Sequence, residues 1–178
     1  MRMMPGWRLD ALPGEVELPP EDGATFAEIA LTKARAVAAA TGRPSLGEDS
    51  GLEAEALGGA PGIHSARFAA DGEGNATDEE NLAKLRREAP AGSALRYVCA
   101  LAYVDPGRGR ERVFRGTCEG LLADEPRGDG GFGYDPVFLA DLAPNGLTMA
   151  QLADEQKDAI SHRGEAVRAL RAWLEAER

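Results

Sequence analysis

The chain has 178 residues, of which 43% are hydrophobic and 28% charged, and its formal net charge is −10. This length is typical of one domain with a real core, so a single domain over residues 1–178 is predicted. Negative charge of this size opposes binding to nucleic acid and to anionic membranes, and neither is expected as a partner.

No targeting segment or membrane span is predicted, which favours a cytoplasmic protein. The first 23 residues contain proline, glycine and acids but no apolar core of a leader, and no apolar run approaches the length of a membrane span. Cys99 and Cys118 fall in apolar, strand-like stretches. Buried free thiols are favoured over a disulfide there, and the two histidines and two cysteines lack the spacing of a zinc site.

The first half of the chain is predicted to contain two capped helices and one short strand. Thr25 and Glu28 have the spacing of a capping box, and Thr77 and Glu80 repeat it. The short strand is expected to end on its two acids. In chain order, the elements are an extended or turn-like stretch over 1–24, a helix over 25–42, a strand over 43–49 and a helix over 77–89.

The second half is predicted to form a hairpin followed by a glycine-rich loop and two helical segments. The expected elements are strands over 94–104 and 112–124 joined by a turn over 105–110, a loop running into a short strand over 127–139, a short helix plus a turn over 148–160, and a helix over 161–177. Helices before and after a central hairpin predict a mixed α/β sheet covered by helices.

Two adjacent acids, Glu48 and Asp49, are the first candidate site. Neighbouring carboxylates repel each other unless a cation shares them. Mg²⁺ prefers oxygen ligands and commonly uses one or two carboxylates together with substrate phosphates, while the small residues Ser50 and Gly51 would let a ligand approach the backbone. Considered alone, the pair is explained more simply as two solvated acids at an exposed strand end.

The glycine-rich stretch "RGDGGFGYDP" is the second candidate. Phe132 and Tyr134 lie among closely spaced glycines, and aromatic rings of this kind stack on planar ligands such as nucleobases. Asp135 precedes a proline, which favours an extended exit from the loop. The alternative is a mobile surface loop, against which the clustered aromatic residues argue.

The third candidate is "KDAISHRGEA", where Ser161 is expected to cap the last helix. His162 and Arg163 then lie in the first turn, where cations oppose the helix dipole. A bound anion or polar ring would explain them, with Lys157 in the preceding turn pointing to the same region. A mixed-charge surface turn explains them equally well.

Three further residues have simple structural explanations when each is considered alone. Lys33 fits a lysine at the edge of a helix face, whose stem packs while its charge reaches water. Glu21 fits a solvated loop acid. His64 has no acid partner in the sequence and fits a structural role better than a catalytic one.

Together, the segments "EDSGLEAEALGGAPGIHSARF", "GGFGYDPVF" and "EQKDAISHRGEA" closely resemble the inosine/xanthosine triphosphate pyrophosphatase family, over about residues 15–175. The resemblance implies an elongated mixed α/β sheet with helices on both sides, two lobes around a nucleotide cleft, and a homodimer. It implies Mg²⁺-dependent hydrolysis of a nucleoside triphosphate to the monophosphate and pyrophosphate. The implied substrates are deaminated purine nucleotides such as ITP, dITP and XTP.

The resemblance also implies roles at the phosphate end of the site. Asp49 matches the general base and a metal-site acid, and Glu21 matches a metal-binding acid. Lys33, twelve residues after Glu21, matches a lysine that contacts phosphate. Glu48 stands where the family usually has a second aspartate, so its longer side chain is a less certain metal ligand.

The resemblance also implies a substrate contact from Ser50 and, at the base end, a set of residues that hold the base. That set is Phe132, Gly133, Tyr134, Asp135, Lys157, His162 and Arg163. Donors from His162 and Arg163 suit the 6-oxo group of hypoxanthine or xanthine. Adenine carries an amino group there and would leave them unpaired, a penalty of roughly 1–3 kcal/mol.

One family element has no counterpart in this sequence. The family opens with a strand and a turn of the form Thr/Ser-x-Asn-x-x-Lys that binds the triphosphate, whereas "MRMMPGWRLDAL" aligns after it. A misplaced start is favoured as the explanation; a chain that truly begins at Met1 is expected to bind triphosphate weakly. Two alternatives therefore stay open: a related pyrophosphatase for modified nucleotides, and a catalytically weak nucleotide-binding dimer.

Overall fold

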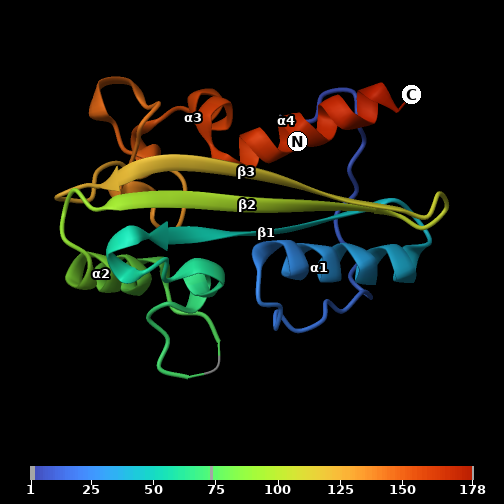
Figure 1. Ribbon diagram of the computed structural model, residues 1–178, viewed down its shortest axis with the longest axis horizontal. Helices are drawn as coiled ribbons and strands as arrows, with labels where there is room; N and C mark the ends of the chain where they lie inside the picture. Colours follow the sequence, from blue (N-terminus) through green and yellow to red (C-terminus); the bar gives the residue numbers. More distant parts are fainter. Residues whose placement is uncertain (1–2, 73, 178) are drawn as a thin grey trace.

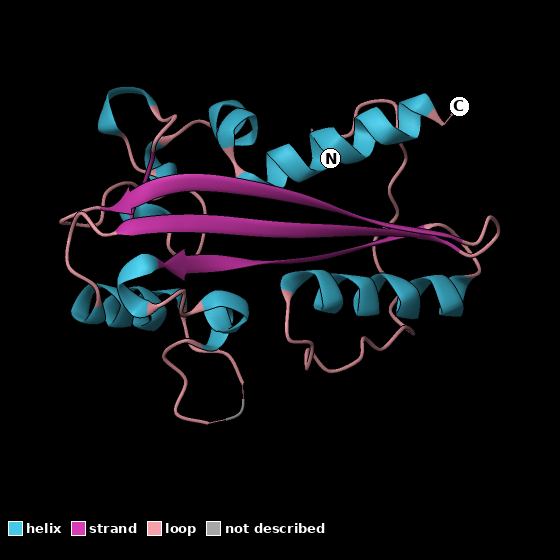
Figure 2. Ribbon diagram, viewed as in Figure 1, coloured by secondary structure: helices cyan, strands magenta, loops and turns pink. Residues whose placement is uncertain are grey.

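The computed structural model describes residues 3–72 and 74–177, which form one antiparallel sheet with helices on both faces (Figures 1 and 2). The strand order is β1-β2-β3-β4, and all three pairings are antiparallel. The predicted α/β class is confirmed. The strands are β1 (Ser45–Ala54), β2 (Ala94–Asp105), β3 (Arg110–Leu122) and β4 (Phe138–Ala140), and the helices are α1 (Phe26–Thr41), α2 (Asp78–Glu88), α3 (Asp154–Ile160) and α4 (His162–Ala176).

The hairpin β2–β3 is the centre of the sheet, as predicted, and its side chains alternate between the two faces. Val98 and Ala100 of β2 pack in the cluster that contains the buried face of α1. Cys99 and Leu101, one residue further along in each case, pack in the cluster that contains α4. Helices α1 and α4 therefore cover opposite faces of the sheet (Figure 1).

Helix α1 begins and ends close to where the capping pattern predicts. The Thr25 hydroxyl accepts a hydrogen bond from the Glu28 amide, and Gly42 ends the helix in the left-handed conformation. Gly47 on β1 lets the helix approach closely, because a Cβ at this position would overlap the Ala30 carbonyl oxygen. This contact brings the α1 side chains within reach of β1.

The prediction that the first strand ends on its two acids is wrong, because β1 continues to Ala54. Its second half pairs with the start of β2, and Leu52 and Ala54 are fully buried. Glu48 and Asp49 therefore lie in the middle of a strand. The apolar residues that follow the acids are buried in the sheet. This burial stabilises the strand more than the serine and glycine at positions 50 and 51 weaken it.

The prediction that Cys99 and Cys118 are buried free thiols is confirmed. Burial raises the pKa of each thiol to about 12, which makes both poorly reactive. None of the helices within residues 3–72 and 74–177 combines the length and apolar character that crossing a membrane requires.

Candidate active site

Glu48 and Asp49 are adjacent in sequence but lie on opposite faces of β1. Asp49 is paired with Ala100, whose side chain faces α1, and Glu48 is paired with Leu101, whose side chain faces α4. The two carboxylates consequently have different partners: Asp49 binds Lys33 on α1, and Glu48 binds Arg163 on α4. The strand thus separates two charges that would otherwise repel each other, and gives each its own cation.

On the α1 side, Lys33 holds two acids together. Its Nζ lies 2.6 Å from Glu21 Oε1 and 3.0 Å from Asp49 Oδ1, and it donates a further hydrogen bond of 3.1 Å to the backbone oxygen of Glu48. The side chains of Lys33 and Asp49 are only 15% and 11% exposed, whereas that of Glu21 is 44% exposed. The group, called here the acid–lysine cluster, therefore opens to solvent beside Glu21.

The environment of the acid–lysine cluster shifts the pKa of both of its inner members, Asp49 and Lys33. Burial raises the pKa of the Asp49 carboxyl, and the nearby Lys33 only partly offsets this effect. Burial also acts to lower the pKa of Lys33, but its hydrogen bonds to Glu21 and Asp49 outweigh burial and raise it. Asp49 Oδ2 is buried and has no hydrogen-bond partner among the described residues, so its capacity to accept a hydrogen bond is unused.

The donor set fits a hard divalent cation in part. Glu21 and Asp49 converge on the same ammonium group, and carboxylate oxygens are the ligands that Mg²⁺ prefers. No group of three His, Cys, Asp or Glu side chains suited to a metal occurs in the described part of the chain. Water or substrate phosphate would have to complete the coordination shell, because Glu48, the expected third ligand, is bound to Arg163.

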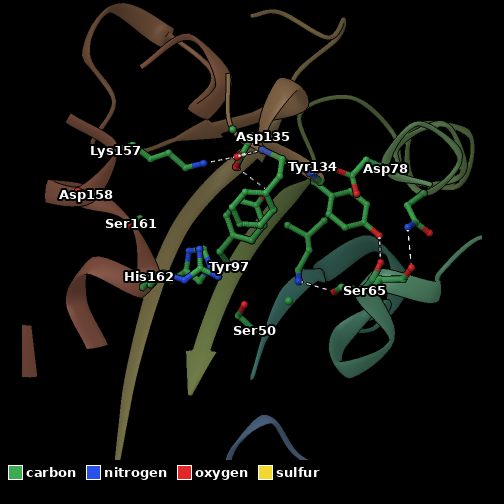
Figure 3. A pocket seen from close by; sticks show the side chains of 18 of the residues that line it. Ser50, Ser65, Asp78, Tyr97, Tyr134, Asp135, Lys157, Asp158, Ser161 and His162 are labelled. Atoms are coloured by element: carbon green, nitrogen blue, oxygen red, sulfur yellow. Dashed lines mark hydrogen bonds and ion pairs between the residues drawn. The ribbon is translucent and has the colours of Figure 1, made fainter. Parts of the chain in front are cut away.

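On the other side of β1 lies a cavity of about 420 Å³, a size typical of small-molecule sites (Figure 3). Its lining comes mainly from β1, β2, α2, the segment Gly62–Arg67, the glycine-rich loop and both C-terminal helices. Ser50 enters it from β1. The predicted residues that line it are Ser50, Phe132, Gly133, Tyr134, Asp135, Lys157, His162 and Arg163.

A stack of three rings supports one wall of the cavity, and two of the rings, His162 and Tyr97, line it. His162 lies 4.7 Å from Tyr97 between ring centroids, at an interplanar angle of 17°, and Tyr97 stacks on Phe138 at 4.3 Å. Burial lowers the pKa of His162 to about 3, and the cations Arg163 and Lys157 act in the same direction. The imidazole is therefore neutral near pH 7, and its buried Nδ1 has no hydrogen-bond partner among the described residues.

Asp135 organises the glycine-rich loop. It is 3% exposed and accepts hydrogen bonds from the Phe132 amide (2.9 Å), the Tyr97 hydroxyl (3.2 Å) and the Lys157 ammonium. The chain fits around this carboxylate only with glycine at position 131, where φ is +76° and a Cβ would overlap Asp135 Oδ2. Lys157 reaches Asp135 from α3, and not from a turn as predicted.

The two aromatic residues of the loop have different positions. Tyr134 is buried, and its hydroxyl donates a 2.8 Å hydrogen bond to the Ser65 carbonyl oxygen, so its ring forms part of the wall. Phe132 is 55% exposed, with Lys157 Nζ 4.9 Å and the Arg163 guanidinium 5.3 Å from its ring centroid. Phe132 is therefore the loop aromatic that remains accessible to an incoming ring.

The lining residues that sequence reasoning missed include Ser65, Asp78 and Tyr97 (Figure 3). Asp78, at the start of α2, accepts a 2.6 Å hydrogen bond from the Gly133 amide and thereby ties the loop to that helix. Tyr97 lies in an apolar strand, and nothing in its sequence neighbourhood distinguishes it from a core tyrosine. A buried phenol needs a hydrogen-bond partner, but this signal does not separate Tyr97 from Tyr103 in the same strand.

Comparisons with known proteins place the chain in a family. The model of the Ham1 family matches residues 3–173. A dITP/XTP pyrophosphatase from Geobacillus kaustophilus is 48% identical over 154 residues, covering 84% of this chain and 72% of that protein. One from Deinococcus radiodurans is 47% identical over 170 residues, covering 94% and 80%.

Solved structures agree with these sequence matches. A HAM1 protein from Coxiella burnetii superposes with a TM-score of 0.80 at 38% identity, covering 90% of this chain and 82% of that one. The family resemblance of the three sequence motifs is confirmed, and the chain belongs to the Ham1 family.

Proposed function

We propose that this chain hydrolyses non-canonical purine nucleoside triphosphates, such as ITP, dITP and XTP, to the monophosphate and pyrophosphate with the help of Mg²⁺. The relatives from G. kaustophilus and D. radiodurans are named dITP/XTP pyrophosphatases. In the structure, a cavity suited to a planar ring and a cluster suited to phosphate and metal lie on either side of β1.

The proposal rests on the positions of the cavity and the acid–lysine cluster on either side of β1. Within the described sheet, β1 is an edge strand, with β2 on its inner side. A nucleotide whose base occupies the cavity would direct its phosphates past Ser50 and around this edge toward Asp49. Since Ser50 and Asp49 are consecutive, the cavity and the proposed reaction centre meet at neighbouring residues of β1.

The reaction requires a base and positive charge at the phosphates. Asp49 Oδ2 would take a proton from a water molecule whose oxygen attacks the α-phosphorus, and the bond from that phosphorus to the α–β bridging oxygen would break to release pyrophosphate. Lys33 would offset charge on the polyphosphate. Mg²⁺ held by Glu21 and Asp49 would supply further charge neutralisation when bound.

The base end offers donors that suit an oxopurine. A neutral His162 and the cationic Arg163 would donate to the 6-oxo group, with Phe132 against the ring and Lys157 fixed by Asp135. The amino group of adenine is itself a hydrogen-bond donor at this position. It would leave the donors of His162 and Arg163 unpaired. This difference would discriminate ITP from ATP.

Two further features belong to the proposal. A homodimer follows from the family resemblance, and light scattering of the purified protein checks it. A reducing, cytoplasmic location is supported by the two buried free thiols, Cys99 and Cys118.

The test is pyrophosphate release from ITP and ATP with and without Mg²⁺. Wild-type protein should release pyrophosphate from ITP only with the metal, and Asp49→Asn should lower kcat by about 10²–10⁴-fold, the usual contribution of a general base. The matched control is Asp22→Asn, which removes the charge of an exposed acid next to Glu21 and should retain activity. Full turnover by Asp49→Asn would refute Asp49 as the base, and turnover only with another triphosphate would refute the substrate class.

A further inference from the structure

The ion pair between Glu48 and Arg163 joins the middle of β1 to the first turn of α4. The Arg163 Nε lies 2.9 Å from both carboxylate oxygens of Glu48, and Nη2 lies 2.7 Å from Oε1. Each side chain is 31% exposed. A two-point pairing of this kind fixes the plane of the guanidinium as well as its position.

We propose that Glu48 is a positioning residue that aims Arg163 at the oxo group of the purine base, and is not a metal ligand. The inference rests on the proposed function, because it assigns a specificity role at the same site. It differs from the role implied by the family resemblance, which placed Glu48 with the metal-binding acids.

The hydrogen bonds of Arg163 to Glu48 leave Nη1 and the second N–H of Nη2 for a ligand. Nε and Nη2 are engaged by Glu48, while Nη1 makes no hydrogen bond to the described residues. Arg163 lines the cavity, and its guanidinium lies 5.3 Å from the Phe132 ring centroid. With the plane fixed and these donors left over, Arg163 presents directed donors next to the aromatic surface on which a base would stack.

The surroundings of Glu48 argue against a metal role for its carboxylate. Its side chain lies on the α4 face of β1, opposite Asp49, and Oε1 accepts a further hydrogen bond of 3.2 Å from the Ser50 hydroxyl. Its backbone oxygen accepts from Lys33. Glu48 therefore links the cavity to the acid–lysine cluster through its main chain, while its carboxylate serves the cavity.

The experiment measures binding of IMP by calorimetry in the presence of EDTA, so that no metal contributes. Glu48→Gln should weaken IMP binding by about tenfold, as expected for loss of a charge-assisted pair. Arg163→Ala should weaken it at least as much, and the double variant should be no weaker than Arg163→Ala alone. Glu48→Asp, which keeps the carboxylate, should recover part of the affinity.

A matched control is Glu111→Gln, which breaks the exposed pair of Glu111 with Arg35, whose Nη2–Oε2 distance is 2.5 Å. It should leave IMP binding unchanged. In turnover of ITP with Mg²⁺, the loss in Glu48→Gln should fall on KM and not on kcat, and the preference for ITP over ATP should shrink.

Two results separate failure of this inference from failure of the proposed function. Wild-type IMP affinity in Glu48→Gln under EDTA, together with a raised Mg²⁺ requirement for ITP turnover, would overturn the positioning role and restore Glu48 as a metal ligand. Absence of ITP turnover by the wild-type protein would instead refute the proposed function itself. The Arg163 Nε–H resonance of ¹⁵N-labelled protein tests the pairing in either case, and an unchanged resonance in Glu48→Gln would refute it.

Discussion

Lys33 and Asp49 face each other between α1 and β1, with Nζ 3.0 Å from Oδ1. Because Gly47 lets α1 lie close to the strand, the lysine reaches the carboxylate while 85% of its side-chain surface is covered (15% exposed). Lys33 neutralises a buried acid in the free protein, and the same ammonium is available to a polyphosphate. One residue thus serves both stability and the proposed chemistry.

Replacing Lys33 with methionine should therefore lower both stability and activity. Without its cation, Asp49 would remain a buried carboxylate with no counter-charge, which costs roughly 1–3 kcal/mol of unfolding free energy. ITP turnover should fall as well, since charge on the polyphosphate is no longer offset. Urea denaturation and steady-state kinetics measure the two effects.

The matched control for this change is Arg35→Met on the same helix, which removes an exposed cation paired with Glu111. Exposed pairs contribute about 0–1 kcal/mol, so this variant should stay close to wild type in stability and turnover. Equal losses in both variants would show that Lys33 acts only through the general stability of α1.

The protonation of Asp49 predicts how pH and metal should interact. Burial raises the pKa of this carboxyl in the metal-free protein, so activity should decline on the acid side as Asp49 becomes protonated. A cation bound at Asp49 competes with the proton. Raising Mg²⁺ should therefore move the acid limb of the kcat/KM profile to lower pH, and an acid limb independent of Mg²⁺ would contradict metal binding at Asp49.

The parts of the fold that local chemistry determines were predictable from the sequence. Capping residues placed both ends of α1 and the start of α2, and the two long apolar strands with a glycine-containing turn predicted the hairpin. These features depend on neighbours within a few residues, so the pattern alone contains the information.

The site was less predictable, because its partners come from distant parts of the chain. The adjacency of Glu48 and Asp49 suggested a shared cation, but the alternation of β1 gives them to Arg163 and Lys33 on opposite faces. A strand that is predicted to end at Glu48 and Asp49 gives no reason to place their side chains on opposite faces. Tyr97 could not be predicted as a site residue either, because its role depends on a hydrogen bond to Asp135, 38 positions away.

His162 predicts a specific dependence of stability on pH. Its pKa in the folded protein is about 3, below the ordinary value of 6.5, so the unfolded chain binds a proton more readily. The contribution of the neutral imidazole is fully present above pH 6.5 and is lost as pH falls from 6.5 toward 3. The free energy of unfolding of His162→Gln should accordingly decline less over this interval than that of wild type.

The chain offers a matched control for this measurement, because His64 is its only other histidine and is exposed. His64→Gln should follow the wild-type curve between pH 6.5 and pH 3. Parallel curves for His162→Gln and wild type would mean that burial does not hold the imidazole neutral. Chemical denaturation at several pH values provides the comparison.

The shape of the glycine-rich loop is tested by Gly131→Ala. The residue has φ of +76°, and a Cβ would overlap the Asp135 carboxylate that holds Lys157 and the Phe132 amide. The substitution should raise KM for ITP because the loop must move away from Asp135.

Gly109→Ala is the matched control: φ is +61° in the hairpin turn, and a Cβ there would meet no atom within 4 Å. Both variants carry a backbone cost of about 1–2 kcal/mol, but only Gly131→Ala disturbs the cavity. If both raise KM equally, the effect comes from lost stability and the loop has no special part in binding the base.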